Sequence, residues 1–257
     1  MIIPKKEILY APMLGTLGGG SARGFGRGIG SAEIDIPTSY DPLGDGSGRA
    51  LYMFENNAND AGNNWNATAY AGAGYNTTYY KVGTHSLDVT NGGYVLTPNL
   101  VQPEISPWTA MWWWRRPNSS GLTVNNRMVD FKEHSTSQGT TVSWESDSSW
   151  HFILRVNSTG PNSSKLVGSG SSLNNGNWHH ICVGASGTYG SQVPFVYVNG
   201  QSVNSNTSYG RSDSSEDAGI KIGTGYGGDS TGYFDNWRLF HGALTQSEIQ
   251  TIYNAEV

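Results

Sequence analysis

The sequence predicts an all-β protein: a sandwich of two antiparallel sheets with one short C-terminal helix and an extended N-terminal arm. Residues 194–203, Pro-Phe-Val-Tyr-Val-Asn-Gly-Gln-Ser-Val, alternate with period two around Asn199-Gly200, which is the sequence form of a hairpin with a type I′ turn. The chain is 14% charged and 12% aromatic with 35 glycines, a composition that suits strands and turns. Thr245-Gln246-Ser247-Glu248 has the form of a capping box, and Ile249, Ile252 and Tyr253 follow on one helical face.

The chain divides near residue 48. Residues 15–30 are half glycine, so neither a strand pattern nor a helix pattern continues through them. A turn-rich joint follows over residues 40–48. We therefore expect a glycine-rich arm over residues 1–48 and one sandwich domain over residues 49–257, which is long enough to bury a sizeable core.

Apolar side chains are spaced along this arm, at Tyr10, Leu14, Leu17, Phe25 and Ile29. A plain disordered or cloning-derived leader would not need them. The alternative is an anchoring arm that becomes ordered against a partner or a neighbouring subunit, where glycines let the backbone approach closely. This second interpretation predicts contacts with other proteins or with further copies of this chain, and we expect a homo-oligomer.

Charge and hydropathy exclude several classes of partner. A net charge of −5 and a pI near 5.6 argue against nucleic acid, because phosphate binding needs a basic face. No apolar run approaches the roughly 18–20 residues of a membrane span, so we expect no membrane insertion. Residues 1–7 lack the apolar run of a secretory signal, so either a signal was removed or export uses another route. The single cysteine, Cys182, lies in an apolar strand and is expected in the core.

Two motifs carry a family resemblance. Residues 177–183 read Asn-Trp-His-His-Ile-Cys-Val ahead of the 194–203 hairpin, and residues 243–253 read Ala-Leu-Thr-Gln-Ser-Glu-Ile-Gln-Thr-Ile-Tyr. They resemble the central hairpin and the closing helix of laminin-G-like domains, which are concanavalin-A-like jelly rolls. The family's other strands are resembled, in the same order, by residues 51–64, 81–89, 94–98, 108–117, 219–223 and 232–240. The resemblance implies a jelly roll over residues 49–257 and a family that binds ligands more often than it cleaves them.

A second resemblance concerns the arm. Residues 9–26 are similar to the leaders of structural proteins from tailed phages, particularly marine ones. This implies a location in the virion, as a capsid decoration or fibre protein whose arm contacts other virion proteins. A secreted, extracellular protein is the alternative.

The sequence contains no complete catalytic motif. Glu33-Ile34-Asp35 places two carboxylates on alternate residues, as in sandwich-fold glucanases, but Pro37 stands where a third carboxylate is expected. Nucleophile-elbow, metalloprotease, phosphate-loop and dinucleotide-binding motifs are missing. We therefore expect no enzymatic activity and assign no catalytic residue.

Candidate metal ligands lie in two places. His179 and His180 are neighbours on a strand and point to opposite faces, so they cannot chelate one ion. The family resemblance implies one structural calcium ion, held by Asp60 in the first loop and Asp235 in the last strand. Oxygen ligands suit calcium, but aspartates in such loops also form ordinary turns.

The aromatic strand 112–115 divides its side chains between two faces, with Trp112 and Trp114 on one and Trp113 and Arg115 on the other. At least one face must belong to the core. Either all three indoles are packed, or Trp113 forms a stacking platform for a sugar ring together with Trp144 and Trp150.

Two classes of function remain open. The first is a non-catalytic virion structural protein whose arm docks into an assembly and whose lectin-like sandwich is displayed outward for glycan or host-surface contact. The second is a secreted carbohydrate-binding module or a degenerate glycoside hydrolase. The arm distinguishes them, because an isolated lectin needs none.

Overall fold

The computed structural model describes residues 35–98, 100, 107–117, 126–131, 141–144, 150–155, 163–168, 173, 175–187, 193–203, 219–225, 228–229 and 232–257. Residues 33–257 form one compact unit. The predicted arm residues Tyr10, Leu14, Leu17, Phe25 and Ile29, and also Glu33, lie outside the described residues.

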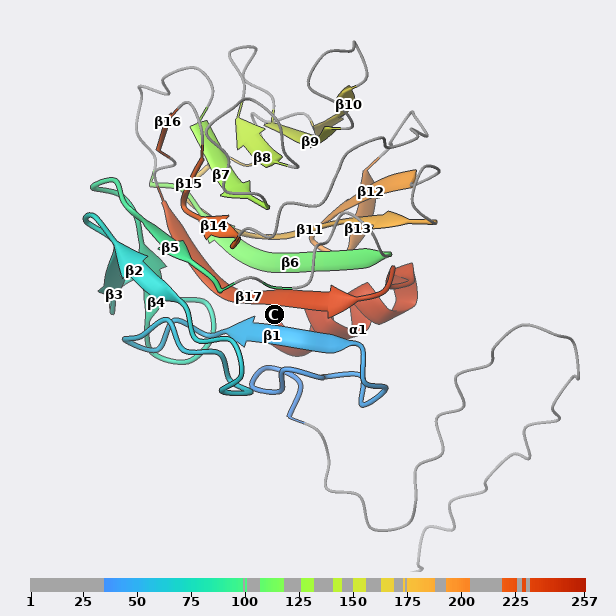
Figure 1. Ribbon diagram of the computed structural model, residues 1–257, viewed down its shortest axis with the longest axis horizontal. Coiled ribbons are helices and arrows are strands. Elements are labelled where there is room, and N and C mark those ends of the chain that lie inside the picture. The colour runs from blue at the N-terminus through green and yellow to red at the C-terminus, as the bar shows by residue number, and fades with distance from the viewer. Residues whose placement is uncertain are drawn as a thin grey trace, which may run out of the picture. The chain divides into compact units, whose positions relative to one another are not determined.

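The larger unit is the predicted sandwich of two sheets, which face each other in Figure 1. Sheet A contains, in spatial order, β13 (Gln201–Val203), β12 (Val193–Val198), β11 (Trp178–Ser186), β6 (Trp108–Arg115), β17 (Tyr233–His241), β4 (Ser86–Asp88) and β3 (Gly74–Asn76), and β1 (Gly48–Tyr52) also pairs with β17. Its neighbouring strands run antiparallel.

Sheet B forms the second layer. It contains, in spatial order, β10 (Ser163–Gly168), β9 (Trp150–Arg155), β8 (Thr141–Trp144), β7 (Asn126–Asp130), β14 (Lys221–Ile222), β5 (Tyr94–Leu96) and β2 (Thr68–Tyr70). The short strands β15 (Thr224–Gly225) and β16 (Gly228–Asp229) pair with each other, and β16 also joins β7.

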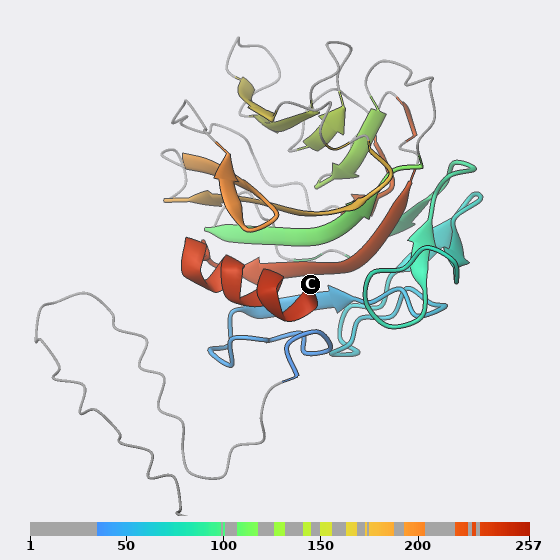
Figure 2. The same ribbon diagram turned by 180° about the vertical axis from the view of Figure 1, so that it is seen from behind.

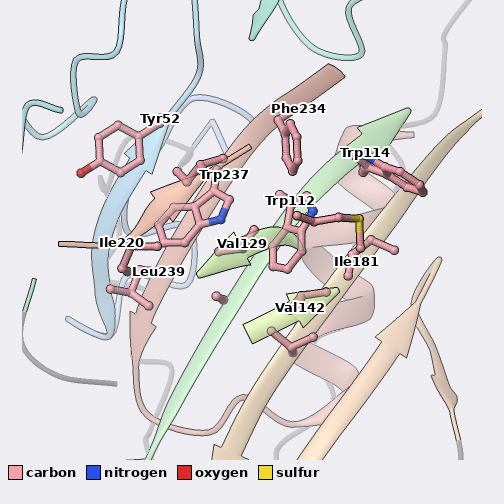
Figure 3. Packing of buried hydrophobic residues seen from close by; sticks show 14 of the residues in the cluster. Tyr52, Trp112, Trp114, Val129, Val142, Ile181, Ile220, Phe234, Trp237 and Leu239 are labelled. Carbon is pink, nitrogen blue, oxygen red and sulfur yellow. The ribbon is translucent and has the colours of Figure 1, made fainter. Parts of the chain in front are cut away.

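The main core lies between the two sheets, because strand alternation sends every second side chain inward. In β6 the inward residues include Trp112 and Trp114, and both are buried. Figure 3 shows these two indoles with Phe234 and Trp237 of β17, packed towards Val129 and Val142 of sheet B. The predicted division of the tryptophan strand between two faces is therefore confirmed.

The predicted hairpin and helix are also confirmed. Asn199 and Gly200, between β12 and β13, both have positive φ, 49° and 72°, as a type I′ turn requires. The helix α1 (Gln246–Glu256) begins after Thr245, whose side chain accepts a hydrogen bond from the Glu248 N–H, while the Glu248 carboxylate accepts one from the Thr245 N–H. In the described part of the chain, no helix is long and apolar enough to cross a membrane.

The helix covers the outer face of sheet A and creates a second core. Figure 2 shows α1 in front of β17. Its Ile249 and Ile252 pack on Met111, Cys182 and Phe240, which point outward from three strands. Cys182 is buried, as expected, and burial raises the pKa of its thiol.

Residues 35–47 are part of this unit. Ile36 packs against the second core, and the Ser47 carbonyl accepts a hydrogen bond from the His241 N–H at 2.8 Å. The buried guanidinium of Arg238 donates to the carbonyls of Ile36, Pro37 and Ser39. The segment that reads as a turn-rich joint in the sequence therefore supplies partners to a buried charge. The boundary predicted after residue 48 stays a prediction.

Candidate functional site

Trp113 does not form the predicted sugar platform. Its side chain is 2% exposed, and its indole N–H donates to the Glu256 carboxylate at 2.7 Å. The ring stacks on Tyr253 of α1, with centroids 5.7 Å apart, and meets the ring of His180 at 5.2 Å. Alternation places Trp113 outside the sheet, as predicted, but α1 covers that face, so no ring surface remains for a ligand.

The other two predicted platform residues lie on neighbouring strands. Trp144 of β8 and Trp150 of β9 are register partners in sheet B. Their side chains are outside the described part of the structure, so their role in sugar binding stays a prediction.

An exposed aromatic cluster lies elsewhere, on the outer face of sheet B. Tyr70 of β2 and Tyr94 of β5 are register partners, and their rings stack with centroids 5.1 Å apart at 17°. The Lys221 ammonium of β14 lies 4.9 Å from the centroid of the Tyr94 ring. Because Val95 and Ile222 point into the core, their neighbours Tyr94 and Lys221 must face outward. We call Tyr70, Tyr94 and Lys221 the tyrosine ladder.

The ladder joins an apolar ring surface to polar groups. Tyr70 is 41% exposed, so its ring retains an open surface although it stacks on Tyr94. Thr68 is the next outward residue on β2 and is exposed, opposite Leu96. Lys221 lies opposite both Leu96 and Asp130 in register. This combination of a held aromatic ring, a hydroxyl and an ammonium group suits a ligand with apolar faces and a polar edge.

Sequence reasoning missed the ladder because its residues are far apart along the chain. Residues 68–70 and 94–96 are short strands beside glycine turns, and neither shows a long alternating pattern. In the sequence, one tyrosine in each of these two strands is the feature that could have indicated the ladder. Their pairing depends on sheet topology, which only the structure provides.

Asp235 organises a loop on the opposite side of the sandwich. The buried Asp235 carboxylate accepts the backbone N–H groups of Lys81 and Val82, at 2.7 and 3.0 Å, and that of Asn236 at 2.8 Å. Burial raises the pKa of Asp235 above its usual range, although these N–H groups oppose the shift. The carboxylate of Glu55 holds the far end of the same loop through Thr84.

Residues 77–84 therefore form a pinned loop that carries two more exposed tyrosines, Tyr79 and Tyr80. The Tyr79 ring is already engaged, because the Arg115 guanidinium lies 3.8 Å from its centroid and Tyr233 packs beside it at 5.1 Å. Tyr80 is 44% exposed, so it is comparable to Tyr70 in exposure but lies on the sheet A side.

Asp60 has a similar structural role in the first loop. Its buried carboxylate accepts the N–H of Leu51 at 2.8 Å and that of Asn64 at 3.1 Å. Among the residues that the structure describes, Asp60 and Asp235 share no hydrogen-bond partner. No group of three or more His, Cys, Asp or Glu side chains in the described ranges is arranged to hold a metal ion. The calcium site at Asp60 and Asp235 stays a prediction.

His179 and His180, the neighbouring histidines of β11, have different partners. His180 is buried against Trp113 and Tyr253 beneath α1. The Nε2 of His179 lies 3.0 Å from the Asn175 side-chain oxygen. Burial lowers the pKa of both imidazoles, that of His180 to about 3.

The fold and its exposed aromatic face define a lectin-like β-sandwich. The chain belongs to the concanavalin A-like lectin/glucanases superfamily, whose family model matches residues 89–250. No curated protein matches the sequence significantly.

Solved structures with the same architecture include two toxin domains. The binding domain of Paraclostridial Mosquitocidal Protein 1 is 16% identical with a TM-score of 0.62, and the match covers 80% of this chain and 51% of that one. The binding domain of botulinum neurotoxin DC, solved with rat synaptotagmin II, is 13% identical with a TM-score of 0.65, over 83% and 52%. The chain thus spans about half the length of each.

A third structure matches over nearly its whole length. Domain 4 of AbnA, a GH43 extracellular arabinanase from Geobacillus stearothermophilus, was solved with arabinotriose. It is 16% identical with a TM-score of 0.53, over 79% of this chain and 97% of that domain. At these identities the three likenesses establish the fold alone.

Proposed function

We propose that the sandwich is a non-catalytic glycan-binding domain that contacts sugars through the tyrosine ladder. The observation that carries this proposal is the exposed Tyr70 ring, stacked on Tyr94 with Lys221 beside it. The superfamily contains both lectins and glucanases, so membership is compatible with sugar recognition but does not decide it.

The chemistry of the ladder matches a sugar ring. Sugars have apolar C–H faces and hydrogen-bonding edges, so an aromatic surface flanked by polar groups complements them. Tyr70 supplies the ring surface, and Thr68 and Lys221 supply hydrogen-bond donors on the same sheet face. Stacking on Tyr94 already restricts the Tyr70 ring, so less side-chain entropy is lost on binding.

Structures of the same fold support a binding role. One toxin binding domain was solved in complex with rat synaptotagmin II, and the arabinanase domain was solved with arabinotriose. We favour the sugar for this chain because the ladder is an open aromatic surface with polar groups at its side.

The N-terminal arm bears on where the protein would bind glycans. We infer that the arm predicted over residues 1–48, through its first 34 residues, attaches the protein to a virion as a decoration or fibre protein and that the sandwich is displayed outward. The resemblance of residues 9–26 to phage leaders supports this. A secreted carbohydrate-binding protein is the alternative. Co-purification of the full-length chain with particles, and loss of the 35–257 variant from them, would favour the virion.

A glycan array followed by calorimetry tests the sugar proposal. We expect the wild type to bind at least one glycan class and Tyr70→Ala to weaken that affinity about tenfold or more, because a stacking contact is lost. Tyr80→Ala removes an equally exposed tyrosine from the other side of the sandwich and should leave the affinity within about twofold. Binding that is insensitive to Tyr70→Ala, or the absence of any bound glycan, would contradict the proposal.

A further inference from the structure

Arg116 is a buried cation to which the described residues offer no anion. It directly follows β6, its side chain is 2% exposed, and neither Nε nor Nη1 has a hydrogen-bond partner among the described residues. Arg238 is equally buried but has the Glu256 carboxylate and three backbone carbonyls as partners. The described residues thus provide acceptors for the buried guanidinium of Arg238 but not for Nε and Nη1 of Arg116.

A second unpaired donor lies two residues earlier. The Trp114 indole N–H is buried between the sheets and has no partner in the described part of the chain. Residues i and i+2 of a strand share a face at a spacing of about 6.6–6.8 Å. Arg115, between them, lies on the outer face against Tyr79. Arg116 is the first residue after β6, so we extend the alternation by one residue and place its buried side chain on the same, inner side of the sandwich as that of Trp114.

Gly232 keeps the space beside Trp114 open. A Cβ atom at this position would lie 3.0 Å from the Trp114 Nε1 and 2.7 Å from the Arg115 carbonyl oxygen. Its φ of 149° is also one that side chains rarely adopt. The residue that faces the indole N–H therefore has no side chain that could accept its hydrogen bond.

The two unpaired groups at this end of β6, the Arg116 guanidinium and the Trp114 indole N–H, are both donors, and the guanidinium carries a charge. A buried water molecule can satisfy an N–H group, but it does not neutralise a guanidinium. Buried charges in native proteins are paired, and burial lowers the pKa of Arg116, as it does for a cation without a counter-charge. The missing partner should therefore be a negatively charged hydrogen-bond acceptor.

We propose that Arg116 and Trp114 bind one small oxyanion, a carboxylate or sulfate group, between the sheets at the end of β6. The planar fork of arginine matches two oxygens of such a group, and the indole N–H provides a third donor. The group reaches the site either as a free ion or as the acidic substituent of a sugar. This site is separate from the tyrosine ladder, on the outer face of sheet B, and does not depend on the proposed function.

Thermal unfolding of the full chain tests the site. Protein dialysed into chloride buffer is titrated with sodium sulfate, acetate or glucuronate at constant ionic strength. We expect a saturable rise in Tm, about 5–10 °C at roughly 100 times the Kd, and a 1:1 heat of binding for the wild type. If sulfate alone raises Tm and gives the heat of binding, and acetate and glucuronate do not, the ligand is a free inorganic ion. Tighter binding of glucuronate points to an acidic sugar.

Variants separate this response from the general stabilisation of proteins by sulfate. Arg116→Met should lose the saturable rise and should be as stable as the wild type, or more so, in chloride alone, because no uncompensated charge remains. Arg115→Met, next in sequence but on the outer face, should keep the response. Trp114→Phe should raise the Kd about fivefold through loss of one donor.

Equal titration curves for the wild type and Arg116→Met would overturn the proposal, as would a wild type without saturable heat for all three anions. If Arg116→Met does not fold, Trp114→Phe and the wild-type calorimetry still decide the question. A Trp114→Phe variant with unchanged Kd would remove the indole from the site.

Discussion

Arg238 and Glu256 form an ion pair that water does not reach. Nη2 of Arg238 lies 2.8 Å from Oε1 of Glu256, and the two side chains are 0% and 1% exposed. Glu256 is the last residue of α1, an end of the helix where the macrodipole disfavours negative charge. Its position is explained by its partners, since the same carboxylate also accepts from Trp113 and Asn236.

Breaking this pair should be strongly destabilising. Glu256→Gln leaves the Arg238 charge buried without a counter-charge, and we expect a loss of about 3–5 kcal/mol in the free energy of unfolding. Urea denaturation measures it. In a double-mutant cycle with Arg238→Met, the double variant should be more stable than the sum of the single effects implies. A loss below about 1 kcal/mol, typical of an exposed pair, would contradict this reading.

The same guanidinium sets the N-terminal limit of the folded unit. Removal of residues 1–34 should leave Tm unchanged, because the glycine-rich residues 15–30 carry neither a strand pattern nor a helix pattern that would form a packed element. Removal of residues 1–48 deletes the carbonyls of Ile36, Pro37 and Ser39 and the buried Leu43, so we expect a loss of about 3 kcal/mol or more. Equal melting curves for the two truncations would contradict this expectation and would support the boundary predicted at residue 48.

Local signals predicted the fold well. The Asn199-Gly200 turn, the capping box at Thr245 and the alternation through the tryptophan strand each depend on neighbouring residues, and each is confirmed. The role of Trp113 was wrong for a physical reason: alternation assigns a residue to a face but does not say whether another element covers that face. Here α1, more than 130 residues away in sequence, supplies the cover.

The tyrosine ladder and the Arg116 site could not be predicted from the sequence. Tyr70 and Tyr94 become neighbours only when β2 pairs with β5, and Arg116 is unusual only because the structure gives it no partner. The family resemblance implies that Asp60 and Asp235 are calcium ligands. In the structure both carboxylates accept backbone N–H groups. A sequence shows that a carboxylate is present; the donors around it depend on the fold.

His180 should make stability depend on pH. Burial lowers its pKa to about 3 in the folded protein, against about 6.5 in the unfolded chain. Between these values only the unfolded chain binds the proton, so stability is present above pH 6.5 and is lost as pH falls. From pH 7.5 to pH 5 this one group should remove about 2 kcal/mol.

His180→Phe should remove that part of the pH dependence, because the ring between Trp113 and Tyr253 no longer titrates. Urea unfolding at pH 7.5 and pH 5 measures the difference. His241→Gln, at an exposed position, should keep the wild-type dependence. If the free energy of unfolding changes by the same amount between pH 7.5 and pH 5 in the wild type and in His180→Phe, the imidazole is protonated in the folded state.

Calcium binding at Asp60 and Asp235 can be separated from their loop-organising roles. If both ligate one ion, calcium at about 100 times its Kd should raise Tm by about 5–10 °C over excess chelator, and Asp235→Ala should lose this response. That variant also loses three N–H acceptor contacts, so its Tm falls even without calcium. Glu55→Ala is the matched control, because it releases the other end of the same loop yet should still respond to calcium. Superimposable melting curves of the wild type in calcium and in chelator would leave both aspartates as acceptors of backbone N–H groups alone.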